Sequence, residues 1–300
     1  MLELATQRQL SAHTVAAYRR DLALLSTLSE GQDWPALTHN EVRRYSARLH
    51  ARELAPRSIA RMLSSWRGFF DWLARHTALA ANPVDGVRAP RRPKALPKAL
   101  PVDTAVQLVS SSAAGAHPEP EALCDRAMFE LLYSSGLRVS ELAGLDLRYQ
   151  KPAAGAADPL GWLDLDGAEV TVTGKGGKMR KVPVGSHALA ALRAWLAVRE
   201  APRDGSAALF LSSRGRRATP RLVQLRLKRH AERSGIGVHV HPHVLRHSFA
   251  SHVLQSSGDL RAVQELLGHA SITSTQVYTA LDFQHLAKVY DAAHPRAKSK

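Results

Sequence analysis

A basic, proline-rich segment about a third of the way along the chain is the feature that most constrains the fold. Residues 82–101 read NPVDGVRAPRRPKALPKALP. Proline lacks a backbone N–H and has a fixed φ, so a helix does not run through such a segment, and we expect an extended backbone here. The sequence therefore predicts two domains, at residues 1–90 and 102–300, joined by a linker at residues 91–101.

The first domain is predicted to be helical. A periodic stretch runs from Ser11 to Leu28, and THNE at 38–41 has the spacing of a capping box ahead of a second helix. The clearest 3.6-residue period follows Pro56, and we interpret its apolar face as core rather than as a platform for stacking bases. That face consists of Ile59, Met62, Leu63, Trp66, Phe69, Phe70 and Leu73. The arginines on the other faces either meet phosphates or are solvated: Arg57, Arg61, Arg67 and Arg75.

The second domain is predicted to be mainly α with a small antiparallel sheet. EVTVT and MRKVPV alternate around GKGGK within 169–184, which predicts two strands joined by a glycine-containing turn. Residues 150–161 are interpreted as a loop insertion, and Gly136 as a C-terminal helix cap. Helices are expected near 102–109, 121–135, from 139, and near 188–199, 220–234, 244–255, 260–267 and 272–279.

The charge of the chain indicates a polyanionic partner. The 300 residues contain 41 Lys and Arg against 26 Asp and Glu, a net charge of +15. Residues 1–95 hold 15 basic and 8 acidic side chains and the remainder hold 26 and 18, so both segments are basic. This distribution favours two surfaces that bind one nucleic acid, although ribosomal and membrane-surface proteins share the composition.

The remaining composition is that of a cytoplasmic protein. The single cysteine, Cys124, excludes an intramolecular disulfide, and its apolar neighbours predict a position in a helical core. The first residues do not combine a basic and an apolar region as a signal peptide does, and no apolar run reaches the roughly 18 residues of a membrane span. We therefore expect a cytoplasmic location.

Four short motifs contain residues that suit phosphoryl chemistry. They are GLRVSEL with Arg138, TGKGGK with Lys175, HPHVLRH with His243 and Arg246, and LGHASITSTQVY with His269 and Tyr278. Each residue alone has an ordinary structural explanation, such as a surface arginine, a hairpin glycine turn, a capping histidine or a core tyrosine. Lys178 competes with Lys175 for any role on the hairpin.

Taken together, the order, context and spacing of these motifs resemble the active-site boxes of tyrosine site-specific recombinases, the phage integrase family. The C-terminal LDFQHLAKVYDAAHPRAKSK resembles the Xer recombinases, and the XerC branch in particular. The resemblance implies a helical DNA-binding domain and an α+β catalytic domain that form a clamp around DNA. The catalytic set it implies is Arg138, Lys175, His243, Arg246, His269 and Tyr278. The 150–161 insertion departs from the pattern without removing any of these residues.

The chemistry explains why these residue types are needed. Attack of a phenolic oxygen on a phosphodiester builds negative charge on the nonbridging oxygens, which two planar guanidinium groups, Arg138 and Arg246, can stabilise. Only about one unperturbed tyrosine in a thousand is ionised at pH 7, so Tyr278 needs a base such as His243. His269 is expected to bind a phosphate oxygen, and Lys175 to protonate the leaving 5′ oxygen. A phosphotyrosyl intermediate retains the bond energy, so the chemistry needs no ATP, metal or other cofactor.

The resemblance also implies partners. It predicts double-stranded DNA with a dif-like recombination site, a XerD-like recombinase in a heterotetramer, and regulation by a septal DNA translocase during chromosome dimer resolution. The apolar residues after the tyrosine are expected to dock on the catalytic domain of a neighbouring protomer. These residues are Leu281, Leu286, Val289 and Tyr290.

Three other interpretations remain open. The histidines of HVHPHVLRH suggest metal-assisted phosphoester hydrolysis, although Pro242 interrupts the strand that would align them and no carboxylate accompanies them. These histidines are His239, His241, His243 and His247. A noncatalytic DNA-binding protein explains the charge but not the six residues. A mobile-element integrase or a type IB topoisomerase would use the same chemistry, and strand exchange between two duplexes separates recombinases from topoisomerases.

Overall fold

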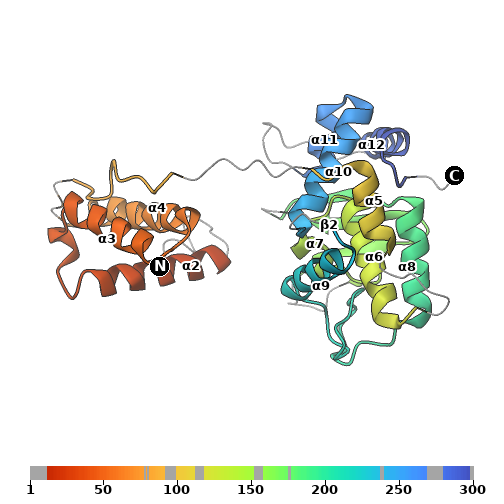
Figure 1. The fold of residues 1–300 in the computed structure, drawn as a ribbon, viewed down its shortest axis with the longest axis horizontal. Coiled ribbons are helices and arrows are strands. Elements are labelled where there is room, and N and C mark those ends of the chain that lie inside the picture. Colours follow the sequence, from red (N-terminus) through yellow and green to blue (C-terminus); the bar gives the residue numbers. More distant parts are fainter. Residues whose placement is uncertain are drawn as a thin grey trace. The chain divides into compact units, whose positions relative to one another are not determined.

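The computed structural model describes most of the chain and divides it into two compact units. The described residues are 12–77, 79, 81–91, 99–111, 118–151, 158–174, 177–236, 240–268 and 280–297, without the side chains of 12, 13 and 280–285. The units are Met1–Leu96 and Pro97–Lys300 (Figure 1). Most described regular structure is helical, and the strands form one small sheet, so the predicted fold class is confirmed.

The described residues of the first unit form three α-helices and a short 3-10 turn. They are α2 (Ala12–Leu28), η1 (Trp34–Ala36), α3 (His39–Ala51) and α4 (Pro56–Leu73). Thr38 and Glu41 form the expected capping box at the start of α3, where the Glu41 carboxylate accepts the Thr38 N–H at 2.8 Å. Pro56 occupies the first turn of α4, where its missing N–H costs no helical hydrogen bond.

The apolar face of α4 forms the centre of this unit's core. Trp66 and Phe70 are fully buried, and Trp66 Nε1 donates to the Asp21 carbonyl oxygen of α2 at 2.8 Å. Arg61 forms an ion pair with the buried carboxylate of Asp21, whereas Arg57 is exposed. The aromatic face of α4 is therefore core, as expected, and Arg61 links α4 to α2 through Asp21 while its own side chain stays 43% exposed.

The first part of the proline-rich segment is turned rather than extended. Val84 and Val87 are buried in the core of the first unit, and backbone hydrogen bonds join Asp85 to Asn82 and Val87 to Val84. Arg67 of α4 donates to the carbonyl oxygens of Val84 and Val87. The expectation of an extended backbone is wrong for these residues, because two valines and a guanidinium bind the segment to α4.

In the second unit, five other helices pack against α6 (Pro120–Ser134), and every residue of α6 from Ala127 onward is buried. Figure 1 shows α6 beside α5, α8 and α9. Met128, Phe129, Leu131 and Leu132 of α6 are all 0% exposed. The described helices of the second unit are α5 (Val102–Ser110), α6 (Pro120–Ser134), α7 (Val139–Ala143), α8 (Ser186–Val198), α9 (Pro220–Arg233), α10 (Pro242–Ser257), α11 (Leu260–Leu267) and α12 (Ala280–Ala293). The helix expected at 272–279 lies outside the described residues.

The sheet of this unit has three antiparallel strands in the order β1-β2-β3. The predicted hairpin is confirmed as β2 (Glu169–Thr173) and β3 (Met179–Pro183), with Val170 opposite Val182. The strand β1 (Gly161–Asp164) was not predicted, because Gly161 was assigned to the loop insertion. A four-residue strand has too little alternation to stand out in a sequence, and its pairing with β2 establishes it.

The C-terminal segment packs on its own unit. Leu286 and Tyr290 of α12 are 3% and 1% exposed and belong to the unit's core, and the Tyr290 hydroxyl shares a hydrogen bond with Ser134 Oγ at 3.1 Å. Arg296 forms a buried two-point ion pair with Glu130 of α6. For Leu286 and Tyr290, the expectation of docking on a neighbour is thus replaced by burial within the same chain; the side chain of Leu281 lies outside the described part.

Cys124 is 1% exposed in α6, as expected for a core cysteine, and burial raises the pKa of its thiol to about 12. Among the helices described, none has both the length and the apolar composition needed to cross a bilayer.

Candidate active site

The site begins where the backbone turns between α6 and α7. Gly136 follows the end of α6 with a φ of +56°, and a Cβ there would lie 2.4 Å from the ring of Phe249. Only glycine satisfies both demands, the left-handed backbone and the close aromatic contact. This turn places Arg138 as the residue that precedes the first turn of α7, with its side chain 32% exposed.

Glu141, one turn into α7, is the carboxylate on which three arginines converge. It accepts the backbone N–H of Arg138 at 2.8 Å and Arg138 Nη1 at 2.7 Å. Arg180 of β3 donates Nη1 to Oε1 at 2.9 Å and Nη2 to Oε2 at 2.8 Å. Arg246 of α10 completes the group, with Nη1 4.0 Å from Oε2. The side chain of Glu141 is only 4% exposed, so this carboxylate organises the group from within the core.

The same three arginines bind the C-terminal end of α11. Arg180 Nε donates to the Leu266 carbonyl oxygen at 3.0 Å, Arg246 Nη2 donates to that of Leu267, and Arg138 Nη2 approaches that of Gly268 at 3.4 Å. The last carbonyl groups of a helix lack intrahelical donors and carry partial negative charge, so guanidinium groups are favourable partners there. Residue 269 follows directly, so these contacts fix where the chain leaves α11.

The electrostatics of the group favour an anion. Although burial alone would raise the pKa of Glu141, hydrogen bonds and charge from Arg180 and Arg138 hold it below the usual value. Burial, together with the charges of Arg138 and Arg180, lowers the pKa of Arg246 to about 10, so this guanidinium is still charged at neutral pH. Three guanidinium groups share one carboxylate, which leaves excess positive charge for a phosphate group.

The structure brings Arg138 and Arg246 together and places His243 on the same helix as Arg246. His243 is exposed in the first turn of α10, one turn before Arg246. Lys175, His269 and Tyr278 lie outside the described residues. The described neighbours of Lys175 and His269 are Gly174, at the end of β2, and Gly268, at the end of α11. Lys178, the competitor of Lys175, is exposed.

Sequence reasoning missed Glu141 and Arg180. Both carried a signal: Glu141 lies three residues after Arg138, at the acceptor position of a capping box, and Arg180 alternates with Val182 on the buried face of β3. A charged residue at the buried phase of a strand needs a partner, and the partner here comes from a distant helix.

No described residues form a metal site. Within the part of the chain that the structure describes, no group of three or more His, Cys, Asp or Glu side chains is placed to hold a metal ion. The rings of His241 and His243 lie 6.0 Å apart at their centroids, and His239 lies outside the described residues.

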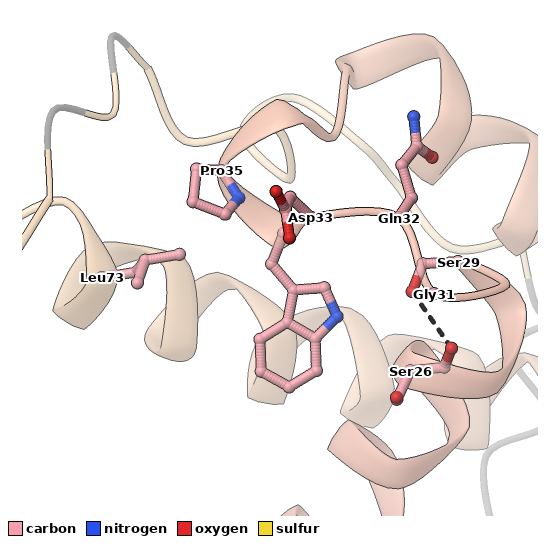
Figure 2. Close-up of a pocket in the computed structure, with 8 residues that line it drawn as sticks. Ser26, Ser29, Gly31, Gln32, Asp33, Pro35 and Leu73 are labelled. Carbon is pink, nitrogen blue, oxygen red and sulfur yellow. Dashed lines mark hydrogen bonds between the residues drawn. The ribbon is translucent and has the colours of Figure 1, made fainter.

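A pocket of about 370 Å³ lies in the first unit, between the α2–η1 connection and the end of α4 (Figure 2). Trp34 and Leu73 provide its apolar lining, and the Ser29 hydroxyl donates to the Ser26 carbonyl oxygen at its edge. None of the six candidate residues is among the residues that line it.

Family models match both parts of this chain. The model of the phage integrase family matches residues 98–285, and that of the phage integrase N-terminal SAM-like domain matches residues 1–77. Tyrosine recombinase XerC 1 of Ralstonia nicotianae is 58% identical over 99% of this chain and 92% of its own length. Tyrosine recombinase XerC of Pseudomonas aeruginosa is 50% identical over 99% and 93%.

Among solved structures, the Tn1549 transposon integrase in complex with circular intermediate DNA has the same fold. Its TM-score is 0.67 at 18% identity, and the match covers 94% of this chain and 95% of that one. At this level of identity the likeness concerns the fold alone.

Proposed function

The chain belongs to the phage integrase family and is a tyrosine recombinase of the Xer type, and from this premise we propose that Tyr278 is the nucleophile that cleaves DNA. The observation that carries the proposal is the convergence of Arg138 and Arg246 on Glu141 at the end of α11. The two arginines come from distant parts of the chain and share one carboxylate with Arg180, so excess positive charge remains where they meet, as the binding of a phosphodiester requires.

Arg138 and Arg246 would stabilise the five-coordinate transition state. Negative charge builds on the nonbridging oxygens during the attack, and fixed cationic donors need little reorganisation at that moment. Their side chains are held by Glu141 and by the α11 carbonyl oxygens before DNA arrives. Holding donors in place in advance is the main electrostatic contribution that a protein makes to such a reaction.

The histidines and the lysine would move protons. His243 is proposed to accept or orient the proton of Tyr278, and His269 to donate to a phosphate oxygen. Lys175 is proposed to protonate the leaving 5′ oxygen. Attack by the tyrosine oxygen forms a 3′-phosphotyrosyl bond and releases a 5′ hydroxyl, and attack by a 5′ hydroxyl from another strand reverses the step and frees the tyrosine. The balance requires no ATP or metal ion.

DNA binding is proposed to involve both parts of the chain. Residues 1–90 would form a helical DNA-binding domain, residues 91–101 a basic linker and residues 102–300 the catalytic domain, with the two domains closing as a clamp around the duplex. The net charge of +15, shared by both segments, supports this proposal because phosphate neutralisation dominates nonspecific affinity. The Tn1549 integrase likeness supports the fold that such a clamp requires.

The XerC relatives suggest a biological setting. We propose a dif-like chromosomal site, a XerD-like partner in a heterotetramer, regulation by a septal translocase and the resolution of chromosome dimers in the cytoplasm. Leu286 and Tyr290 are buried in the core of their own chain. A contact with a neighbouring protomer through the C-terminal segment would therefore use the outer face of α12, or it would require α12 to detach from its own unit.

A nicked suicide substrate tests the reaction class. The nick lets a short 5′-hydroxyl fragment diffuse away after cleavage, so a covalent protein–DNA complex accumulates without added divalent metal. We expect peptide mapping to place the DNA on Tyr278, and Tyr278→Phe to bind DNA without forming the complex. An adduct on another residue, or cleavage that a chelator abolishes, would refute the proposal. Strand exchange between two duplexes then distinguishes a recombinase from a topoisomerase.

A further inference from the structure

We propose that Arg180 is a positioning residue for strand cleavage: it saturates Glu141 and fixes the end of α11, so that Arg138 and Arg246 are held for the phosphate. The inference deepens the proposed function and rests on it. Arg180 belongs to none of the four motifs and has no direct part in the proposed chemistry.

The contacts of Arg180 are those of a fixed bridge. Its side chain is 5% exposed, and three of its nitrogens donate: Nη1 and Nη2 to the two oxygens of Glu141, and Nε to the Leu266 carbonyl oxygen. The planar guanidinium therefore links strand β3, helix α7 and the end of α11 through one rigid group. A lysine could reach one of these partners but could not reproduce the fork.

Arg180 also packs against the residue that ends α11. Gly268 has a φ of +63°, and a Cβ on it would lie 3.1 Å from Arg180 Cδ and 3.2 Å from Nε. The backbone at Gly268 thus approaches the guanidinium as closely as a glycine allows. Removing the guanidinium would free both the carbonyl of Leu266 and the backbone of Gly268, next to His269.

The second effect concerns the charge of Glu141. Arg180 occupies both carboxylate oxygens at 2.9 and 2.8 Å, while Arg246 stays 4.0 Å from Oε2. Without Arg180, the buried carboxylate would lose two hydrogen bonds and keep Arg138 as its close cation, and a poorly paired charge in the core is costly. Glu141 would then hold Arg138 more tightly and draw Arg246 closer, which would turn their donors away from DNA. Arg180 thereby keeps the two arginines available.

The test compares Arg180 with a buried arginine elsewhere in the unit. Arg226 of α9 is a matched control, because its side chain is 8% exposed and it pairs with the carboxylates of Glu121 and Asp125, away from α11. The variants are R180M, R180K, E141Q, R226M and the double variant E141Q/R180M. Thermal unfolding first gives a temperature at which every variant is folded. The nicked suicide substrate then gives the single-turnover rate of covalent complex formation, and DNA affinity is measured separately by fluorescence anisotropy.

We expect R180M to slow covalent complex formation by roughly 10- to 100-fold, since displacing catalytic groups by about 1 Å has effects of this size, with little change in DNA affinity. R180K should recover part of the rate. R226M should lose stability yet cleave at the wild-type rate. The defects of E141Q and R180M should combine in the double variant to less than their product, because Arg180 acts through Glu141.

Three results would overturn the inference while leaving the proposed function intact: R180M and R180K both cleaving as fast as wild type, R226M losing as much rate as R180M, or fully additive defects in E141Q/R180M. A wild-type protein that forms no covalent complex would overturn the proposed function, and this inference with it. Covalent complex formation by the wild-type protein therefore distinguishes failure of this inference from failure of the proposed function.

Discussion

Arg138 and Arg246, from different helices, donate to the carbonyl oxygens of adjacent residues at the end of α11. Arg138 Nη2 approaches Gly268 at 3.4 Å, and Arg246 Nη2 binds Leu267. Because both side chains also face Glu141, their guanidinium planes are determined before any substrate binds. The end of one short helix thus holds both guanidinium groups of the proposed phosphate site.

Replacing either arginine by lysine should impair chemistry more than binding. In R138K or R246K the charge remains but the two-point fork is lost. We expect single-turnover cleavage of the suicide substrate to fall about 100-fold or more, the size of effect seen when one preorganised donor is removed. The dissociation constant for the same DNA, measured by anisotropy, should change little. Equal losses of rate and affinity would show that these arginines only bind DNA.

Lysine 175 should become dispensable when the leaving group needs no proton. A substrate with a 5′-bridging sulfur releases a thiolate, which leaves readily without a general acid. K175A should therefore be strongly defective on ordinary DNA and close to wild type on the sulfur-substituted DNA. K178A, on the same hairpin, is the matched control and should cleave both substrates normally. An undiminished K175A defect on the sulfur substrate would remove the general-acid role.

Histidine 294 should make the second unit less stable in mild acid. Its ring stacks on Tyr290 with centroids 5.2 Å apart, its Nδ1 accepts the Arg296 N–H, and burial lowers its pKa to about 3, with help from His252 and Arg296. Between pH 3 and 6.5, His294 is protonated in the unfolded chain but neutral in the folded chain. The free energy of unfolding is therefore unaffected by His294 above pH 6.5, and it falls below pH 6.5 by at most about 1.4 kcal/mol per pH unit.

The measurement is the free energy of unfolding against pH, for wild type and H294F. Phenylalanine keeps the aromatic packing and does not titrate. Burial also lowers the pKa of His252, which acts in the same direction, and raises the pKa of Asp125 to about 6, which acts in the opposite direction. The difference between the two proteins isolates His294. We expect H294F to show a flatter decline from pH 6.5 to 4.5, and parallel curves would contradict the assignment.

Tyrosine 290 should stabilise the isolated chain. Its side chain is 1% exposed in the chain's own core and its hydroxyl shares a hydrogen bond with Ser134. We expect Tyr290→Phe to lower the free energy of unfolding by about 1 kcal/mol, the usual value of one hydrogen bond, and Tyr290→Ala by about 3–5 kcal/mol through the cavity it leaves. Urea titration at low protein concentration measures both. A monomer of unchanged stability would instead favour docking on a neighbour.

Local patterns in the sequence predicted much of the secondary structure. The period of the segment after Pro56 predicted α4, the Thr38 to Glu41 spacing predicted the capping box of α3, and alternation around residues 169–184 predicted the β2–β3 hairpin. These features depend on interactions between residues close in the chain, so a single sequence contains them. The resemblance to tyrosine recombinases likewise depended on short motifs in a fixed order.

The tertiary structure decided what depends on distant partners. Val84 and Val87 pack into the core of the first unit, where Arg67 of α4 donates to their carbonyl oxygens. Leu286 and Tyr290 are buried because α12 packs against its own unit. Glu141 and Arg180 are 39 residues apart in the sequence, and only the fold pairs them, because it places β3 beside α7. The sequence by itself determined which residues are chemically able to act on a phosphodiester. Only the fold determined how two of them, Arg138 and Arg246, are held, since both guanidinium groups bind carbonyl oxygens at the end of α11, far away in the chain.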